Sequence, residues 1–186
     1  MKKIILLIIV AAALGTWSAS MARAQDQKLC RLTVVQDESS MEKIIEQYLI
    51  ANHKMIVTEK TKGDDLWLEL PMKGETTPAF TIFVDTQPLN KNDAAQVVER
   101  GIIIQAQTRI KVPADRRAAV MRIINDFNRN KAFAAAYVDS DGEILLSWIL
   151  NVLDPAGLDA EYVYDVVARE DMLWRQLYPL VKPAME

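Results

Sequence analysis

The pattern of hydrophobic and polar positions predicts three helices. From about Ser40 to Asn52, hydrophobic residues recur at spacings of three and four, as on the buried side of a helix. Just before this stretch, Ser39-x-x-Glu42 matches a capping box, which satisfies the first backbone amides of a helix. A second helix is expected from Pro113, because proline fits the first helical position. Its buried stripe is Val120, Ile123, Ile124 and Phe127.

The third helix is expected near the end of the sequence. Asp159 is its predicted N-cap, and the hydrophobic spacing continues to about Tyr178. Pro179 and Pro183 are expected to end it, because proline removes a helical hydrogen bond. Trp174 falls on the hydrophobic side of this helix, so we assign it to the core.

Short segments rich in branched and aromatic residues predict strands. The four before the second helix are Met55–Glu59, Leu66–Leu70, Phe80–Val84 and Gly101–Val112. The two after it are Phe133–Val138 and Ile144–Leu150. A helical turn is expected over Ala94–Arg100, and a further short strand over Leu29–Val35. The order helix, four strands, helix, two strands, helix indicates an α+β fold. A mostly antiparallel sheet of about five to six strands then carries the helices on one face.

The alternation along the strands also predicts a sheet face that no helix covers. If the leucines of Leu66–Leu70 point toward the helices, Trp67 points away from them. A sheet face that meets water is normally polar, yet several large hydrophobic residues fall on this one. The residues assigned to it are Trp67, Phe83, Leu145 and Ile149. Because exposed aromatic residues often anchor interfaces, we predict that these four form a binding surface.

A β-hairpin is expected to follow the second helix. Asp141-Gly142 lies between two strand segments, and glycine supplies the positive φ that a tight turn requires. We interpret Asn125 and Asn128 as amides that bond the backbone at the helix end and fix the entry to the hairpin. The loop from Asp139 to Glu143 does not match a calcium-binding loop, because its glycine is fourth instead of sixth.

The same segment resembles the hallmark of the YbjN-domain family, also labelled bacterial sensory transduction regulators. The resemblance extends over Ser39 to Tyr178 and is specific from Asn125 to Leu146. It rests on Asn125, Asn128, Lys131, Phe133, Ala136, Tyr137, Asp139, Asp141, Gly142, Glu143, Ile144 and Leu146. It implies a compact, often dimeric α/β domain that binds proteins, similar in fold to the type III secretion chaperones. An export signal and the extra segment Gln27–Asp37 depart from the usual family pattern.

The N-terminal end has the three-part pattern of a secretory signal peptide. Lys2 and Lys3 precede the apolar run Ile4–Leu14, and Ala22-Arg23-Ala24 is a small-x-small cleavage site. The run is shorter than the roughly 20 residues of a membrane-spanning helix, which argues against an anchor. We therefore predict that residues 1–24 are removed. Residues 25–186 would form a single exported, periplasmic domain with no membrane span.

Charge and cysteine content limit the classes of partner. The formal net charge is −3 at pH 7, and it becomes more negative when Lys2, Lys3 and Arg23 leave with the signal peptide. This acidic excess argues against nucleic acid and anionic membranes, which attract clustered basic residues. Cys30 is the sole cysteine, so an internal disulfide is excluded, and we interpret it as a buried residue of a strand.

The scarcity of histidine and cysteine leads us to predict that the chain is not an enzyme and that it holds no metal and no cofactor. His53 is the sole histidine, which excludes a histidine metal cluster. We expect it at the end of the first helix, where it bonds or charge-stabilises the last carbonyl groups. The carboxylate pairs Glu161 with Asp165, and Glu170 with Asp171, are expected on a solvated helix face.

These inferences lead to a hypothesis for function. The chain is predicted to be an exported, non-enzymatic protein-binding module, chaperone-like or regulatory. It would use its open sheet face to form a homodimer or to hold another polypeptide. The alternative is a periplasmic hydrolase or small-ligand-binding protein, with a carboxylate-lined cleft between the last helix and the sheet. Two or more converging acids in such a cleft would favour the alternative.

Overall fold

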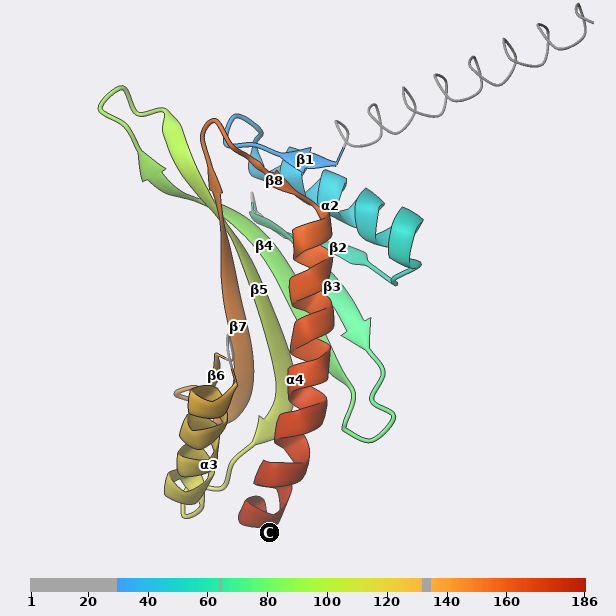
Figure 1. Cartoon of the computed structure of the whole chain (residues 1–186), viewed down its shortest axis with the longest axis vertical. Helices are drawn as coiled ribbons and strands as arrows, with labels where there is room; N and C mark the ends of the chain where they lie inside the picture. Colours follow the sequence, from blue (N-terminus) through green and yellow to red (C-terminus); the bar gives the residue numbers. More distant parts are fainter. Residues whose placement is uncertain (1–29, 64, 132–134) are drawn as a thin grey trace, which may run out of the picture.

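The computed structural model describes residues 30–63, 65–131 and 135–186. Within them, three helices lie on one face of a twisted, curved sheet (Figure 1). The helices are α2 (Glu38–His53), α3 (Arg117–Asn130) and α4 (Glu161–Met185). The strands are β1 (Arg31–Leu32), β2 (Thr58–Lys62), β3 (Asp65–Met72), β4 (Phe80–Lys91), β5 (Val97–Lys111), β6 (Ala136–Val138), β7 (Glu143–Leu153) and β8 (Leu158–Asp159). In this part of the chain, no helix is long and apolar enough to cross a membrane.

Six strands form one antiparallel sheet in the order β2-β3-β4-β5-β7-β6. The remaining two, β1 and β8, pair with each other in a separate two-stranded sheet. The core lies between the main sheet and the helices, where side chains from both layers are fully buried. Its largest members are Trp174, Leu32, Met41, Ile45, Leu49, Leu68, Leu70, Ile82, Ile102, Ile104, Ile144 and Leu146. The predicted α+β class and mostly antiparallel sheet are confirmed.

The start of α2 differs from the prediction. Asp37, not Ser39, is the N-cap, and its side chain accepts a hydrogen bond of 2.7 Å from the amide of Ser40. Glu42 therefore does not close a capping box. It turns inward and is fully buried against the sheet. At the other end, Lys54 adopts the left-handed conformation, and its Nζ donates to the carbonyl of Ala51 at 2.6 Å.

A hairpin replaces the helical turn expected over Ala94–Arg100. Strand β4 runs on to Lys91, and β5 begins at Val97. The Asn92 side-chain oxygen accepts from the amides of Ala94 and Gln96, and Ala95 has a positive φ of 60°. Pairing with a neighbouring strand therefore outweighs the local helical propensity of this segment.

The boundaries of α3 and α4 also differ from the predicted ones. Pro113 precedes α3 and accepts a turn hydrogen bond from the amide of Arg116. Helix α4 begins after Ala160 and continues through Pro179 and Pro183 to Met185. Both prolines are exposed, so water can reach the carbonyl groups that the missing N–H groups leave free. Burial of Leu177 and Val181 on either side of Pro179 favours continuation of the helix.

The predicted hairpin turn between β6 and β7 is present. Gly142 has a φ of 84°, and its amide donates to the carbonyl of Asp139 at 3.2 Å. The Asp139 side chain also accepts from the amide of Glu143 at 2.8 Å. The loop from Asp139 to Glu143 is thus explained by turn chemistry.

The predicted strand Leu29–Val35 is shorter in the structure. Of its described residues, only Arg31 and Leu32 pair with another strand. The half-buried Cys30 packs against the core, and its carbonyl accepts from the amide of Ala160. The predicted signal peptide and Phe133 lie outside the described residues.

Candidate functional site

The four residues predicted to form a binding surface lie on the sheet face opposite the helices. Cross-strand partners share a face, so the register identifies this side of the sheet. Phe83 of β4 pairs with Glu69 and Gln105, and Ile103 of β5 pairs with Ile149. Their sequence neighbours, by contrast, point into the core, as the predicted alternation requires. We call this side the open face.

The structure brings together only two of the four predicted residues. Trp67 and Phe83 line a hollow in the open face with a volume of about 510 Å³. Ile149 lies outside the hollow and is 52% exposed. Leu145 is only 7% exposed and is not available to a partner. Its binding role in the prediction is therefore wrong.

Tyr137 explains why Leu145 is buried on a face that no helix covers. The two residues are cross-strand partners on β6 and β7. Gln105 of β5 donates to the Tyr137 hydroxyl at 2.9 Å, so the phenol ring reaches over β7 to the strand beyond it. The ring thereby covers Leu145, and the hydrogen bond holds it there.

Several residues of the hollow escaped the sequence analysis. The lining consists of Glu38, Asp65, Leu66, Trp67, Phe83, Asp85, Thr86, Gln87, Ile103, Gln105 and Gln107. Ile103 could have been predicted from the sequence, because the alternation of Gln105 and Gln107 along β5 places it on the open face. The position of Glu38 was not, because it comes from the start of α2 and joins the hollow only through tertiary packing.

The charged groups of the hollow are all acidic. They are Glu38, Asp65 and Asp85. Burial raises the pKa of Asp85, a hydrogen bond from the Thr86 amide opposes this, and the nearby charges of Glu38 and Asp65 raise it further. The indole N–H of Trp67 donates to the Glu69 carboxylate at 3.3 Å, which fixes the ring at the side of the hollow.

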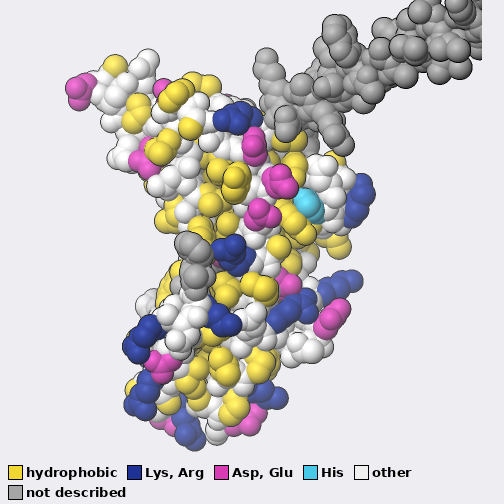
Figure 2. Space-filling model, viewed as in Figure 1, with side chains coloured by type: hydrophobic (Ala, Val, Ile, Leu, Met, Phe, Trp, Pro, Cys, Tyr) yellow, Lys and Arg dark blue, Asp and Glu magenta, His cyan; other side chains and the backbone are white. Residues whose placement is uncertain are grey.

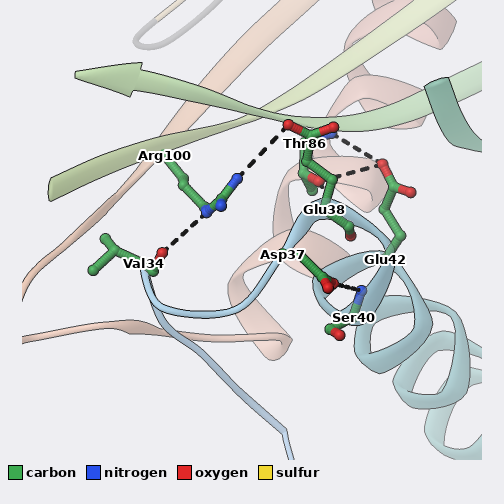
Figure 3. Close-up of polar contacts among 7 residues, drawn as sticks. All are labelled: Val34, Asp37, Glu38, Ser40, Glu42, Thr86 and Arg100. Carbon is green, nitrogen blue, oxygen red and sulfur yellow. Dashed lines mark hydrogen bonds and ion pairs between the residues drawn. The ribbon is translucent and has the colours of Figure 1, made fainter. Parts of the chain in front are cut away.

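Beside the hollow, the outer edge of β4 is covered by α2 (Figure 3). The pairing between β3 and β4 ends at Leu68 and Val84. Beyond this pair, the next β4 amide on the edge that faces β3 belongs to Thr86. That amide and the Thr86 hydroxyl donate to Glu42 Oε1 at 3.2 and 3.3 Å. Arg100 lies close by, where it donates to the carbonyl of Val34 at 3.1 Å and forms a 3.8 Å ion pair with Glu38.

Burial raises the pKa of Glu42 to about 8, despite the hydrogen bonds from Thr86. The neighbouring charges of Asp85 and Glu38 act in the same direction as burial. The side chain is therefore mostly protonated at neutral pH. A neutral carboxyl that bonds the edge of a strand is a structural group, and it blocks this edge against pairing with another strand.

Glu170 corrects another expectation. The sequence placed it on a solvated face, but it is 2% exposed between α4 and β5. Burial raises its pKa well above the usual value, while the nearby backbone of Ala106 acts in the opposite direction. Among the described residues, no other acid contributes to this shift. Asp171, by contrast, bonds Arg175 at 2.9 Å on the helix surface.

His53 is the last residue of α2, as predicted. Its ring stacks on Tyr164 of α4, with centroids 3.3 Å apart and planes at 9°. Lys54 follows it and donates hydrogen bonds to carbonyl groups of the last turn. Figure 2 shows this histidine at the surface of the helix-covered side. Among the residues that the structure describes, no group of three or more His, Cys, Asp or Glu is arranged to hold a metal ion.

Several residues of the predicted family motif form hydrogen bonds that hold the hairpin of β6 and β7 in place. The Asn128 side chain donates to the carbonyl of Ala136 at 2.7 Å and accepts from its amide at 3.1 Å. Asn128 thus bonds the outer edge of β6 as a neighbouring strand would, and it fixes the entry to the hairpin, as the sequence suggested. Asn125 is exposed on α3. Tyr137, Asp139 and Gly142 form the hairpin contacts described above.

A second hollow lies on the helix-covered side, between α3 and α4. Its volume is about 340 Å³, and its lining is Ile123, Asp126, Phe127, Asn130, Lys131 and Leu180. Figure 2 shows hydrophobic side chains gathered in the lower part of this side, where these two helices lie. This hollow is smaller than the hollow of the open face and is not lined by a pair of aromatic residues, so the open face is the better candidate.

Comparison with known proteins agrees with this fold. Residues 98–174 match the model of the YbjN family, described as "Putative bacterial sensory transduction regulator". A solved structure described as "Crystal structure of YbjN, a putative transcription regulator from E. coli" is similar at 14% identity, with a TM-score of 0.52. The similarity covers 82% of this chain and 94% of that chain, and it shows the fold alone. No curated protein matches. The part of the chain that matches the YbjN family is thus residues 98–174, which include most of β5, the whole of α3 and the hairpin of β6 and β7.

Proposed function

We propose that this chain is a non-enzymatic protein-binding module of the bacterial envelope that acts through its open face. The family description as a regulator fits a binding or regulatory role. The observation that carries the proposal is the pair of aromatic residues, Trp67 and Phe83, at a hollow of the open face. Large aromatic groups at such a place contribute strongly to binding when a partner removes them from water.

Binding is expected to depend on the two aromatic anchors. Trp67→Ala and Phe83→Ala should each weaken self-association or capture of a partner by about 2 kcal/mol or more, because each removes an interface anchor. Sedimentation of the purified protein measures self-association, and affinity capture from an envelope extract compares what each variant retains.

Leu180→Ala is the matched control, because Leu180 is 51% exposed in the hollow between α3 and α4. It should leave self-association and capture unchanged. If Leu180→Ala weakens them and Trp67→Ala does not, the binding surface lies on the helix-covered side and the proposal is wrong.

Export is part of the proposal and has its own test. Removal of residues 1–24 by a signal peptidase would leave an N-terminus at or next to Gln25. Mass spectrometry of the protein from the periplasmic fraction measures this directly. An intact Met1 on protein that sediments with the inner membrane would contradict export as a periplasmic domain.

A further inference from the structure

The hollow of the open face combines apolar walls with negative charge. Trp67, Phe83 and Ile103 supply the apolar surface, and Asp65 and Asp85 supply carboxylates beside it. Within the described part of the chain, neither of these carboxylates forms an ion pair with a basic side chain. Burial is the main cause of the raised pKa of Asp85, and the nearby negative charges of Glu38 and Asp65 raise it further.

The sheet edge beside the hollow does not suit addition of a partner strand. The amide of Thr86 is already bonded to Glu42, and Pro88, two residues further along the same edge, has no amide hydrogen. Strand addition relies on such main-chain hydrogen bonds. A partner must therefore use its side chains on the open face rather than pair with β4.

A long basic side chain complements this hollow, because it combines an apolar stem with a positive charge. The methylene groups of lysine or arginine pack on apolar surface while the charged end stays in a polar environment. Its charge is attracted by an aromatic ring and forms strong hydrogen bonds with carboxylates. We propose that the hollow binds a lysine or arginine side chain, flanked by hydrophobic residues, of a partner polypeptide.

This inference rests on the proposed function of the open face and adds the chemistry of its partner. Among the basic residues of the chain itself, Arg100 is ion-paired with Glu38 of the lining, and its guanidinium also donates to the carbonyl of Val34. Lys60 and Lys62 on β2 are the cross-strand partners of Trp67 and Asp65. Both lysines are exposed, neither lines the hollow, and neither is ion-paired with a described carboxylate. They leave the space inside the hollow to a partner.

The test uses the protein with three short peptides, each acetylated and amidated. Their sequence is Gly-Leu-X-Leu-Gly, where X is lysine, norleucine or glutamate. Binding is followed by NMR titration of the indole N–H signal of Trp67, which Trp67→Phe identifies. We expect the lysine peptide to bind about ten-fold more tightly than the norleucine peptide, as for a hydrogen bond to a charged group. The glutamate peptide should bind most weakly.

Asp85→Asn keeps the shape of the side chain and removes its charge, so it should abolish most of the preference for lysine. Asp165→Asn removes the same charge from an exposed position on α4, on the other side of the sheet, and should leave the preference intact. Raising the salt concentration should reduce the preference in the wild type, because salt screens charges at the surface.

Three outcomes would overturn the inference. Equal binding of the lysine and norleucine peptides, with Trp67→Ala weakening both, would keep the open face as a binding surface and remove its preference for a cation. An absence of lysine-peptide binding at millimolar concentration would also exclude the preference. A wild-type dimer in sedimentation that Asp85→Asn dissociates, without any peptide binding, would show a second copy of the chain to be the occupant.

Discussion

The free energy of unfolding is expected to decrease as the pH rises from about 4.5 to about 8, because Glu42 is buried in a form that favours the proton. Its pKa is 4.5 as an ordinary carboxyl and about 8 in the folded protein. Between these values the folded state holds a proton that the unfolded chain releases. The contribution of Glu42 to the free energy of unfolding is therefore fully present below pH 4.5 and is lost as the pH rises to about 8. The loss for this residue is on the order of 3 to 5 kcal/mol. Urea unfolding at a series of pH values measures it.

Glu42→Gln tests the assignment of this pH dependence. The amide oxygen of glutamine can still accept from Thr86, and it cannot ionise. The variant should match the wild type near pH 4.5 and become clearly more stable than it at pH 8. Glu59→Gln, at an exposed position on β2, is the matched control and should reproduce the wild-type curve.

Glu170 is expected to add to the same effect, because burial also raises its pKa. Some pH dependence of the free energy of unfolding should therefore persist in Glu42→Gln. It should become weaker still when Glu170→Gln is combined with that substitution. A wild-type stability that stays flat from pH 4.5 to 8 would mean that neither carboxyl keeps its proton in the folded state.

Trp174→Ala should destabilise the fold by about 3 to 5 kcal/mol, the usual cost of truncating a fully buried aromatic residue. Trp174 is 0% exposed and packs edge-on against Phe80, with ring centroids 6.4 Å apart. Its second aromatic neighbour is Tyr178, at 5.3 Å. Thermal or urea unfolding measures the loss.

Trp174→Phe is the conservative control. The indole N–H has no hydrogen-bond acceptor among the described residues, so phenylalanine loses volume without losing a hydrogen bond. It should cost clearly less than alanine does. Trp67→Ala on the open face should also cost much less stability, because its ring is only half-buried. If Trp67→Ala unfolded the protein as Trp174→Ala does, Trp67 would be a core residue and not a binding anchor.

Features that depend only on neighbouring residues were predictable from the sequence alone. Alternation separated Trp67 from Leu68 and Leu70, which are buried, and Asp141-Gly142 specified the turn between β6 and β7. These predictions succeeded because a strand places successive side chains on opposite faces, and because few residues other than glycine adopt a positive φ easily.

The tertiary structure alone decided which polar groups are buried and which hydrophobic groups are covered. Glu42 bonds Thr86 across 44 positions of the sequence, and Tyr137 covers Leu145 by reaching over β7 to Gln105. The sequence pattern predicted only a carboxyl on a helix and a leucine on an open face. It did not predict the contact of Glu42 with Thr86 or that of Tyr137 with Leu145. Their environments depend on segments that meet only when the chain folds, because burial, and with it the pKa of a carboxyl, is set by every element packed around a group.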